Sequence, residues 1–259
     1  MNKPGVRTGD DDPSMGHKRQ ERRHRSTAGR RPPNTSGRAW SSVEVFEGPP
    51  LGPDLVTASL DEVLAATEAL PADFDWPSLA DRLVPIFQRV RPHPPGSPEP
   101  LRMVVPPGLT VSFAIDIGPA FINVDVDMIE RWDLTRPELL ARALDNLEQR
   151  IAGVMPGELL DGSIGDQAVR LLQSSTGCAS TYVLLPAPLG RILGSAPQLV
   201  MAPMRNLLIS LPIDADREFA SWLFDAFAAQ DPNCLAPAAF VIRDGGLSVE
   251  PLGVPFGRA

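Results

Sequence analysis

The stretch Leu199-Val-Met-Ala-Pro203-Met-Arg205-Asn206-Leu-Leu-Ile-Ser-Leu211 places two apolar runs on either side of a short turn. Apolar runs of this length, bounded by turn residues, are typical of two strands joined as a β-hairpin. The same arrangement returns near the end of the chain, where residues 240–243 and 247–250 flank Asp244-Gly245, a dipeptide that favours a type I′ turn. The sequence therefore predicts antiparallel pairing between strands that are neighbours in the chain.

Further strands are expected upstream of this hairpin. Residues 101–105 and 110–117 indicate two strands, residues 120–126 a third, and residues 167–172 a weaker one. The third strand alternates apolar and polar side chains, as a half-buried strand does: Ile122, Asn123, Val124, Asp125, Val126 and Asp127.

Helices are expected between the strands. A long helix begins at Thr135, because Thr135 and Glu138 form a capping-box pattern, and it ends at Gly153. Two more are expected over residues 179–193 and from Asp214 to about residue 229. Strands in pairs that are interrupted by helices indicate an α+β fold. We therefore expect a mixed or antiparallel sheet with hairpins, packed by two or three helices.

The front of the chain has a different pattern. Ser59 and Glu62 form another capping box, and an apolar stripe predicts a second helix from Trp76 to Val90. Residues 91–98 are rich in proline and indicate an extended linker. The expected divisions are a basic tail and linker over 1–58, a helical front segment and proline-rich linker over 59–100, and an α+β domain over 101–259.

The charge of the chain is divided unequally. Residues 1–40 carry ten basic and four acidic groups, a net charge of +6, so the rest carries −14 of the total of −8. This tail has few large apolar side chains before Trp40, so we expect it to be disordered. The basic cluster over residues 18–31 leaves contact with nucleic acid open, although no aromatic side chains interleave with it for base stacking.

The residue types present exclude several catalytic mechanisms. After Leu101 the chain contains no histidine and no lysine. A Ser-His-Asp triad, a Cys-His pair, a Schiff-base lysine and the lysine of a phosphate-binding loop are therefore excluded from residues 101–259. Carboxylates, arginines, two cysteines and one tyrosine remain. We expect no cofactor, and the balance favours a protein that is not an enzyme.

The cysteines and the apolar runs bear on location. Cys178 and Cys234 have no metal-ligand spacing, so we expect two buried thiols in a reducing compartment, with a single disulfide left open. No apolar run has the length of a membrane span, and the basic N-terminus lacks the apolar core of a secretion signal. We therefore expect a cytoplasmic protein that does not bind membranes.

Three aspartates are the best candidates for acid–base or metal chemistry. Asp116 ends an apolar strand, whereas Asp125 and Asp127 share one face of the next expected strand. If the two strands pair, the three carboxylates gather at one sheet edge, where Asp125 and Asp127 would hold Mg²⁺ or Ca²⁺. The simpler interpretation is that Asp125 and Asp127 form the solvent face of a half-buried strand.

Other candidates are an exposed turn, a helix amide and a polar loop. Arg205 and Asn206 lie in the hairpin turn, where an arginine can fork onto a phosphate or carboxylate; alternatively Asn206 has a positive φ and Arg205 pairs with a helix carboxylate. Asn146 lies on the inward face of the long helix, where a buried amide must bind backbone or ligand. The loop 174–178 can present amides to an anion, but without a histidine a catalytic Cys178 is not expected.

The order of several segments resembles a known family. Four stretches of residues 101–259 carry the resemblance: Val-Ser-Phe-Ala-Ile-Asp-Ile-Gly at 111–118 together with 127–135; 143–147; 182–186; and 199–209 together with 240–247. Through them this region resembles the uncharacterised bacterial YtpQ-like family, a domain of unknown function. The resemblance implies a bacterial cytoplasmic α+β protein. It brings no established activity, ligand or catalytic residue.

The leading hypothesis is a non-catalytic protein that binds a protein partner or a small anion through its α+β domain. Asp116, Asn146, Arg205 and Asn206 are its candidate ligand-binding residues. The first alternative is a carboxylate-dependent enzyme, with or without a metal at Asp125 and Asp127. The second alternative is a basic tail that contacts nucleic acid.

Overall fold

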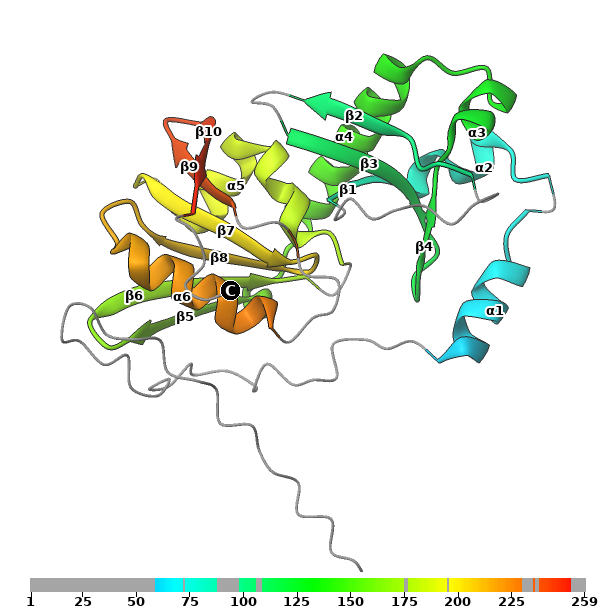
Figure 1. Cartoon of the computed structure of the whole chain (residues 1–259). Helices are drawn as coiled ribbons and strands as arrows, with labels where there is room; N and C mark the ends of the chain where they lie inside the picture. The colour runs from blue at the N-terminus through cyan, green and yellow to red at the C-terminus, as the bar shows by residue number, and fades with distance from the viewer. Residues whose placement is uncertain are drawn as a thin grey trace, which may run out of the picture. The chain divides into compact units, whose positions relative to one another are not determined.

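The computed structural model describes residues 59–252, except for residues 72, 88–97, 106–108, 175–176, 195, 230–234 and 236–237. This part of the chain is an α+β protein, as the sequence predicts, but its strands form two antiparallel sheets rather than the single sheet expected (Figure 1). The expected tail and linker over 1–58, Cys234 and all but the last residue of the proline-rich linker lie outside the described residues.

The smaller sheet is centred on strand β3. Its four strands are β1 (Leu83–Ile86), β2 (Arg102–Val105), β3 (Leu109–Asp116) and β4 (Phe121–Asn123). Strand β3 pairs antiparallel with each of the other three. Strand β2 pairs with residues 109–112 of β3, β4 with residues 114–116, and β1 with residues 112–115. The β3–β4 hairpin thus ends at Asp116 and Phe121, which are partners in the register.

Strand β1 corrects the expectation of a helix over residues 76–90. The helix α2 (Trp76–Leu79) continues only as the 3-10 turn η1 (Ala80–Arg82), and the chain then becomes extended. All four residues of β1 are buried, so the apolar run that suggested a helix stripe is a strand covered on both faces. Pro85 has no N–H to donate, and it is accommodated because β1 pairs on one side only. The front segment therefore contributes a strand to the sheet of residues 102–123.

The expected strand over residues 120–126 is wrong after Asn123. Helix α3 (Val126–Arg131) begins three residues later. The carboxylate of Asp125, the residue just before this helix, accepts a hydrogen bond from the Met128 N–H at 2.8 Å. An aspartate that caps a helix overrides the alternating pattern that precedes it. Helix α4 (Arg136–Ala152) follows with both bonds of the predicted Thr135–Glu138 capping box and ends at Gly153, as expected.

The larger sheet has six strands in the order β10-β9-β7-β8-β6-β5. It contains both predicted hairpins, β7 (Gln198–Met204) with β8 (Leu207–Pro212) and β9 (Ala238–Arg243) with β10 (Gly246–Pro251). Asp244 and Gly245 have φ values of 53° and 73°, which fits the predicted type I′ turn. The third hairpin joins β5 (Leu159–Ile164), which the sequence analysis missed, to β6 (Gln167–Gln173).

The remaining helices differ from expectation in their limits. The single helix expected over 179–193 is a 3-10 helix, η3 (Ala179–Leu184), followed by α5 (Pro186–Leu193), because Pro186 starts a new helix. Helix α6 (Arg217–Ala228) is capped by Asp216 rather than by Asp214. The front helix α1 (Leu60–Glu68) has the predicted Ser59–Glu62 capping box. None of the described helices combines the length and the apolar composition of a membrane span.

The two faces of the larger sheet belong to different hydrophobic cores, since side chains alternate along a strand. On one face, Leu199 and Met201 pack in a core with Phe219 of α6. On the other face, Val200 and Phe240 belong to a core that includes Phe113 of β3, buried residues of α4, and η3. This second core joins the two sheets and carries the polar contacts described next.

Candidate functional site

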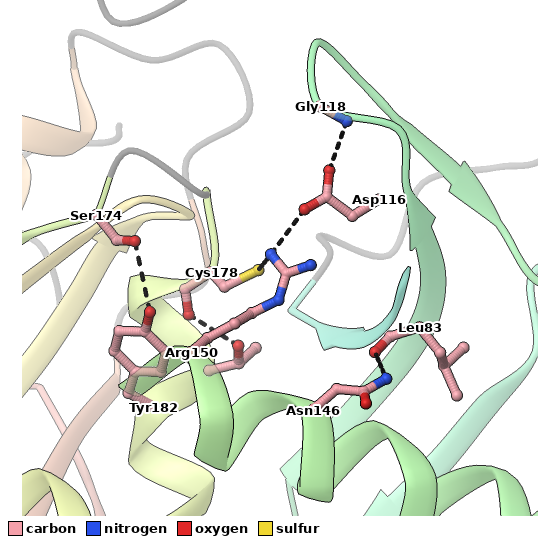
Figure 2. Close-up of polar contacts among 9 residues, drawn as sticks. Leu83, Asp116, Gly118, Asn146, Arg150, Ser174, Cys178 and Tyr182 are labelled. Carbon is pink, nitrogen blue, oxygen red and sulfur yellow. Dashed lines mark hydrogen bonds and ion pairs between the residues drawn. The ribbon is translucent and has the colours of Figure 1, made fainter. Parts of the chain in front are cut away.

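The tip of the β3–β4 hairpin carries the first predicted site residue. One oxygen of the Asp116 carboxylate accepts a hydrogen bond from the Gly118 N–H at 2.8 Å, and Gly118 has a φ of 86°. The Ile117 N–H donates to the Ala120 carbonyl at 3.0 Å and closes the turn. The local sequence Asp-Ile-Gly thus shapes the hairpin tip and fixes the direction of the carboxylate (Figure 2).

Arg150, in the last turn of α4, holds the other oxygen of Asp116. Its guanidinium lies 2.6 Å from that oxygen, and the two side chains are 19% and 13% exposed. The same guanidinium nitrogen lies 3.7 Å from the Cys178 sulfur, so that one group links the hairpin, the helix and the start of η3 (Figure 2). A cation at a helix C-terminus also interacts favourably with the helix dipole.

Arg205 makes a different contact with the same hairpin. Its guanidinium carbon lies 5.7 Å from the centre of the Phe121 ring, within the range of a cation–π contact. Gly177 lies against the same ring, and a Cβ there would come within 3.1 Å of it. Because Gly177 also has a φ of 70°, both the backbone and the space favour glycine at this position.

The main chain of the 205–206 turn is bound to the segment before and within η3. The Ser180 N–H donates to the Arg205 carbonyl and the Ser174 N–H to the Asn206 carbonyl, both at 2.9 Å. The suggestion that Asn206 has a positive φ is wrong, because the described non-glycine residues with positive φ are Phe74, Asp133 and Asp244. Arg205 forms no ion pair with a helix carboxylate among the described residues, and its guanidinium makes the cation–π contact with Phe121 instead.

Several polar residues at the start of η3 and just before it are buried. Cys178 is 1% exposed and forms no disulfide, which confirms the expected buried thiol. The Thr181 hydroxyl donates to the Cys178 carbonyl at 2.9 Å, and the Ser174 and Tyr182 hydroxyl oxygens lie 3.5 Å apart (Figure 2). The Ser180 hydroxyl is fully buried and has no hydrogen-bond partner in the described part of the chain.

Asn146 has the structural role that the sequence analysis weighed against ligand binding. Its side chain is buried, and its amide nitrogen donates to the carbonyls of Ala80 and Leu83 at 2.7 and 2.8 Å. Both amide hydrogens are therefore used to hold the turn into β1 against α4 (Figure 2). The structure does not bring Asn146 into contact with Asp116 or Arg205.

Asp125 and Asp127, the two candidate metal ligands, do not lie on the strand that the sequence pattern predicts. Because β4 ends at Asn123, Asp125 and Asp127 do not share a strand face: Asp125 caps α3 and Asp127 lies in the first turn of that helix. Among the described residues, no group of three histidine, cysteine, aspartate or glutamate side chains is arranged to hold a metal ion.

The residues that define the site were only partly visible in the sequence. Asp116, Arg205 and Asn206 lie in it, but their partners Phe121, Arg150 and Gly177 were missed, because these contacts join segments far apart in the chain.

A hollow of about 410 Å³ lies elsewhere, on the outer side of α4, and is lined by Arg142, Asp145, Glu148, Gln149 and Ala152.

The site thus contains two arginines in different surroundings: Arg150 is neutralised by Asp116, and Arg205 makes a cation–π contact with Phe121. The chain matches no family model, and comparisons with curated proteins and with solved structures give no match. The chemistry of the site is therefore argued from its own residues.

Proposed function

We propose that this is a non-catalytic cytoplasmic binding protein of the YtpQ-like type, which recognises an anionic group of a protein partner or a small anion at Arg205. The observation that carries the proposal is the cation–π contact of Arg205, whose guanidinium carbon lies 5.7 Å from the centre of the Phe121 ring. A contact with a ring leaves the guanidinium N–H groups able to fork onto a carboxylate or phosphate.

The charges around the site support Arg205 over Arg150 as the anion-binding group. Arg150 is neutralised by Asp116 at 2.6 Å, so its charge is already used inside the protein. Arg205 forms no ion pair with any carboxylate in the described residues, and it is half-buried. A partly desolvated cation without a counter-ion attracts an anion more strongly than an exposed one.

The lack of histidine and lysine after Leu101 supports binding rather than catalysis. The Asp116 carboxylate, the leading candidate for acid–base work, accepts hydrogen bonds from Gly118 and Arg150 on its two oxygens. A carboxylate with both oxygens occupied by strong donors is poorly placed to take a proton from a substrate.

Calorimetric titration of the full-length protein with orthophosphate, and with a short peptide that carries one glutamate, tests the proposal. The wild type should bind at least one of them, and Arg205→Ala should abolish the binding. Arg205→Lys should restore it only in part, because an ammonium group keeps the charge but loses the planar fork. Equal binding by Arg205→Ala and wild type would contradict a site at Arg205.

A further inference from the structure

Three aromatic side chains, Phe74, Trp76 and Trp132, gather between the start of α2 and the residue that follows α3. Figure 1 shows these two helices beside each other. The rings of Phe74 and Trp132 are nearly parallel, with an interplanar angle of 20° and centres 6.5 Å apart. The Trp76 ring lies 5.3 Å from Trp132 at a tilt of 39°. All three residues are only partly buried, although each also packs against the core that joins the two sheets.

The backbone at both ends of this cluster is in an unfavourable conformation. Phe74 has a φ of 49° and Asp133 a φ of 53°, and together they are two of the three described non-glycine residues with positive φ. A bulky residue such as phenylalanine rarely adopts this region. The Trp132 indole N–H donates to the Phe74 carbonyl at 2.8 Å and holds the two strained segments together. Strain of this kind is concentrated at binding sites, where it positions side chains.

Carboxylates border the aromatic cluster. Asp73 and Asp75 flank Phe74 in the chain, and Asp133 follows Trp132. In the described residues, none of these three carboxylates forms an ion pair or a hydrogen bond, although arginines pair with other carboxylates in the fold. The Trp76 indole N–H likewise has no acceptor in this part of the structure. The cluster thus combines electron-rich ring faces with negative charge that no described residue neutralises.

We propose that this aromatic–acidic cluster, formed by residues 73–76 and 132–133, binds an arginine side chain of a partner polypeptide. Cations are attracted to the faces of tryptophan and phenylalanine rings. A guanidinium is favoured over a quaternary ammonium because it is planar and can stack on the face of an aromatic ring. Its N–H groups also need the acceptors that the carboxylates supply. The cluster shares no residue with the Arg205 site, and the inference stands independently of the proposed function.

The test is an NMR titration of full-length protein that follows the tryptophan indole N–H signals, assigned with single Trp→Phe variants. The probe is a glycine–serine peptide with one central arginine, compared with its lysine version and with its citrulline version, which keeps the shape and loses the charge. The arginine peptide should shift the Trp76 and Trp132 signals saturably. Trp222, which packs against Phe219 on α6, should not respond. The lysine peptide should bind several-fold more weakly.

Variants separate this site from general attraction to an acidic protein. The double variant Asp75→Asn, Asp133→Asn keeps the side-chain shapes, and asparagine tolerates the positive φ at residue 133. It should weaken binding of the arginine peptide about fivefold. The matched double variant Asp145→Asn, Glu148→Gln on α4 should leave the affinity unchanged. Equal binding of the citrulline peptide, equal or tighter binding of the lysine peptide, an equal loss in both double variants, or no saturable shift of Trp76 and Trp132 would each overturn the inference.

Discussion

Asp116 and Phe121 are partners across the β3–β4 hairpin, and an arginine from a different part of the chain holds each of them. Arg150 of α4 forms an ion pair with Asp116, and Arg205 of the β7–β8 turn makes a cation–π contact with Phe121. The hairpin tip of the smaller sheet is thereby fixed to a long helix and to a turn of the larger sheet. In this double contact the charge of Arg150 is neutralised inside the protein, whereas Arg205 contacts a ring and no carboxylate of the described residues.

Loss of the Asp116–Arg150 ion pair should destabilise the fold. Because both side chains are less than one-fifth exposed, Asp116→Asn should reduce the free energy of unfolding by about 1–3 kcal/mol, measured by urea denaturation. The matched control is Asp81→Asn, which breaks the ion pair with Arg142 but removes a carboxylate that is 85% exposed. That change should cost less than about 1 kcal/mol. Equal losses of unfolding free energy in the two variants would contradict a larger contribution from the Asp116–Arg150 ion pair.

The contact between Gly177 and Phe121 makes a prediction about coupling. Gly177→Ala adds a Cβ against the Phe121 ring and forces a non-glycine residue to a φ of 70°, so it should cost about 1 kcal/mol or more. In a Phe121→Leu background the steric part should disappear while the backbone part remains. A double-mutant cycle by urea denaturation should therefore show that Gly177→Ala costs less in that background. Additive costs would mean that the ring and Gly177 do not contact each other.

Asn146 should be essential for the turn that leads into β1. Asn146→Leu removes the donor from two backbone carbonyls, at Ala80 and Leu83, and should reduce the free energy of unfolding by about 2–3 kcal/mol. Asp145→Asn, on the neighbouring and exposed position of α4, is the control and should have little effect. A neutral Asn146→Leu variant, judged by the same denaturation curves, would exclude a structural role for this amide.

The capping boxes give α1 and α4 a dependence on pH. The hydroxyl and backbone N–H of Thr135 donate to Glu138 at 2.6 and 2.8 Å and hold its pKa below the ordinary value of 4.5; Ser59 has the same effect on the pKa of Glu62. A lowered pKa in the folded state stabilises the fold above the unfolded value, and this contribution is lost as the pH falls through the lower, folded value.

The Glu138→Gln variant tests this dependence. It keeps a side-chain oxygen to accept the hydrogen bonds but has no proton to gain. Between about pH 5 and pH 3 the wild type should therefore lose more stability than the variant, in urea midpoints measured across that range. Parallel losses in the two proteins would contradict a role for the Glu138 carboxylate.

The fold class could be predicted because hairpin turns and helix caps are encoded locally. The β7–β8 and β9–β10 hairpins and the cap at Thr135 depend on residues within a few positions of each other. Strand β1 could not be predicted, because periodicity alone does not distinguish a short apolar strand buried on both faces from a helix stripe. The alternating pattern of apolar and polar residues continues past Asn123, where β4 ends. It therefore hid the role of Asp125 as the cap of α3.

The candidate site could be predicted only as a set of separate polar residues. Asp116 was found because it ends a strand just before a turn, and Arg205 because it occupies a turn, where side chains are commonly functional. Their partners lie 34 and 84 positions away in the chain, at Arg150 and Phe121, and no local signal connects such distant residues. The aromatic–acidic cluster was missed for the same reason, since Phe74 and Trp132 are 58 positions apart.

Recovery of binding partners from the native host tests the central claim, an anion-binding site at Arg205, most directly. Full-length wild type, Arg205→Ala and Arg191→Ala should be used as baits, and bound proteins and small anions quantified by mass spectrometry. Arg191 is an exposed arginine on α5, so its variant makes the same change in charge away from the site. With an anion-binding site at Arg205, the Arg205→Ala bait should lose species that both wild type and Arg191→Ala retain. Recovery of the same species at the same levels by all three baits would contradict it.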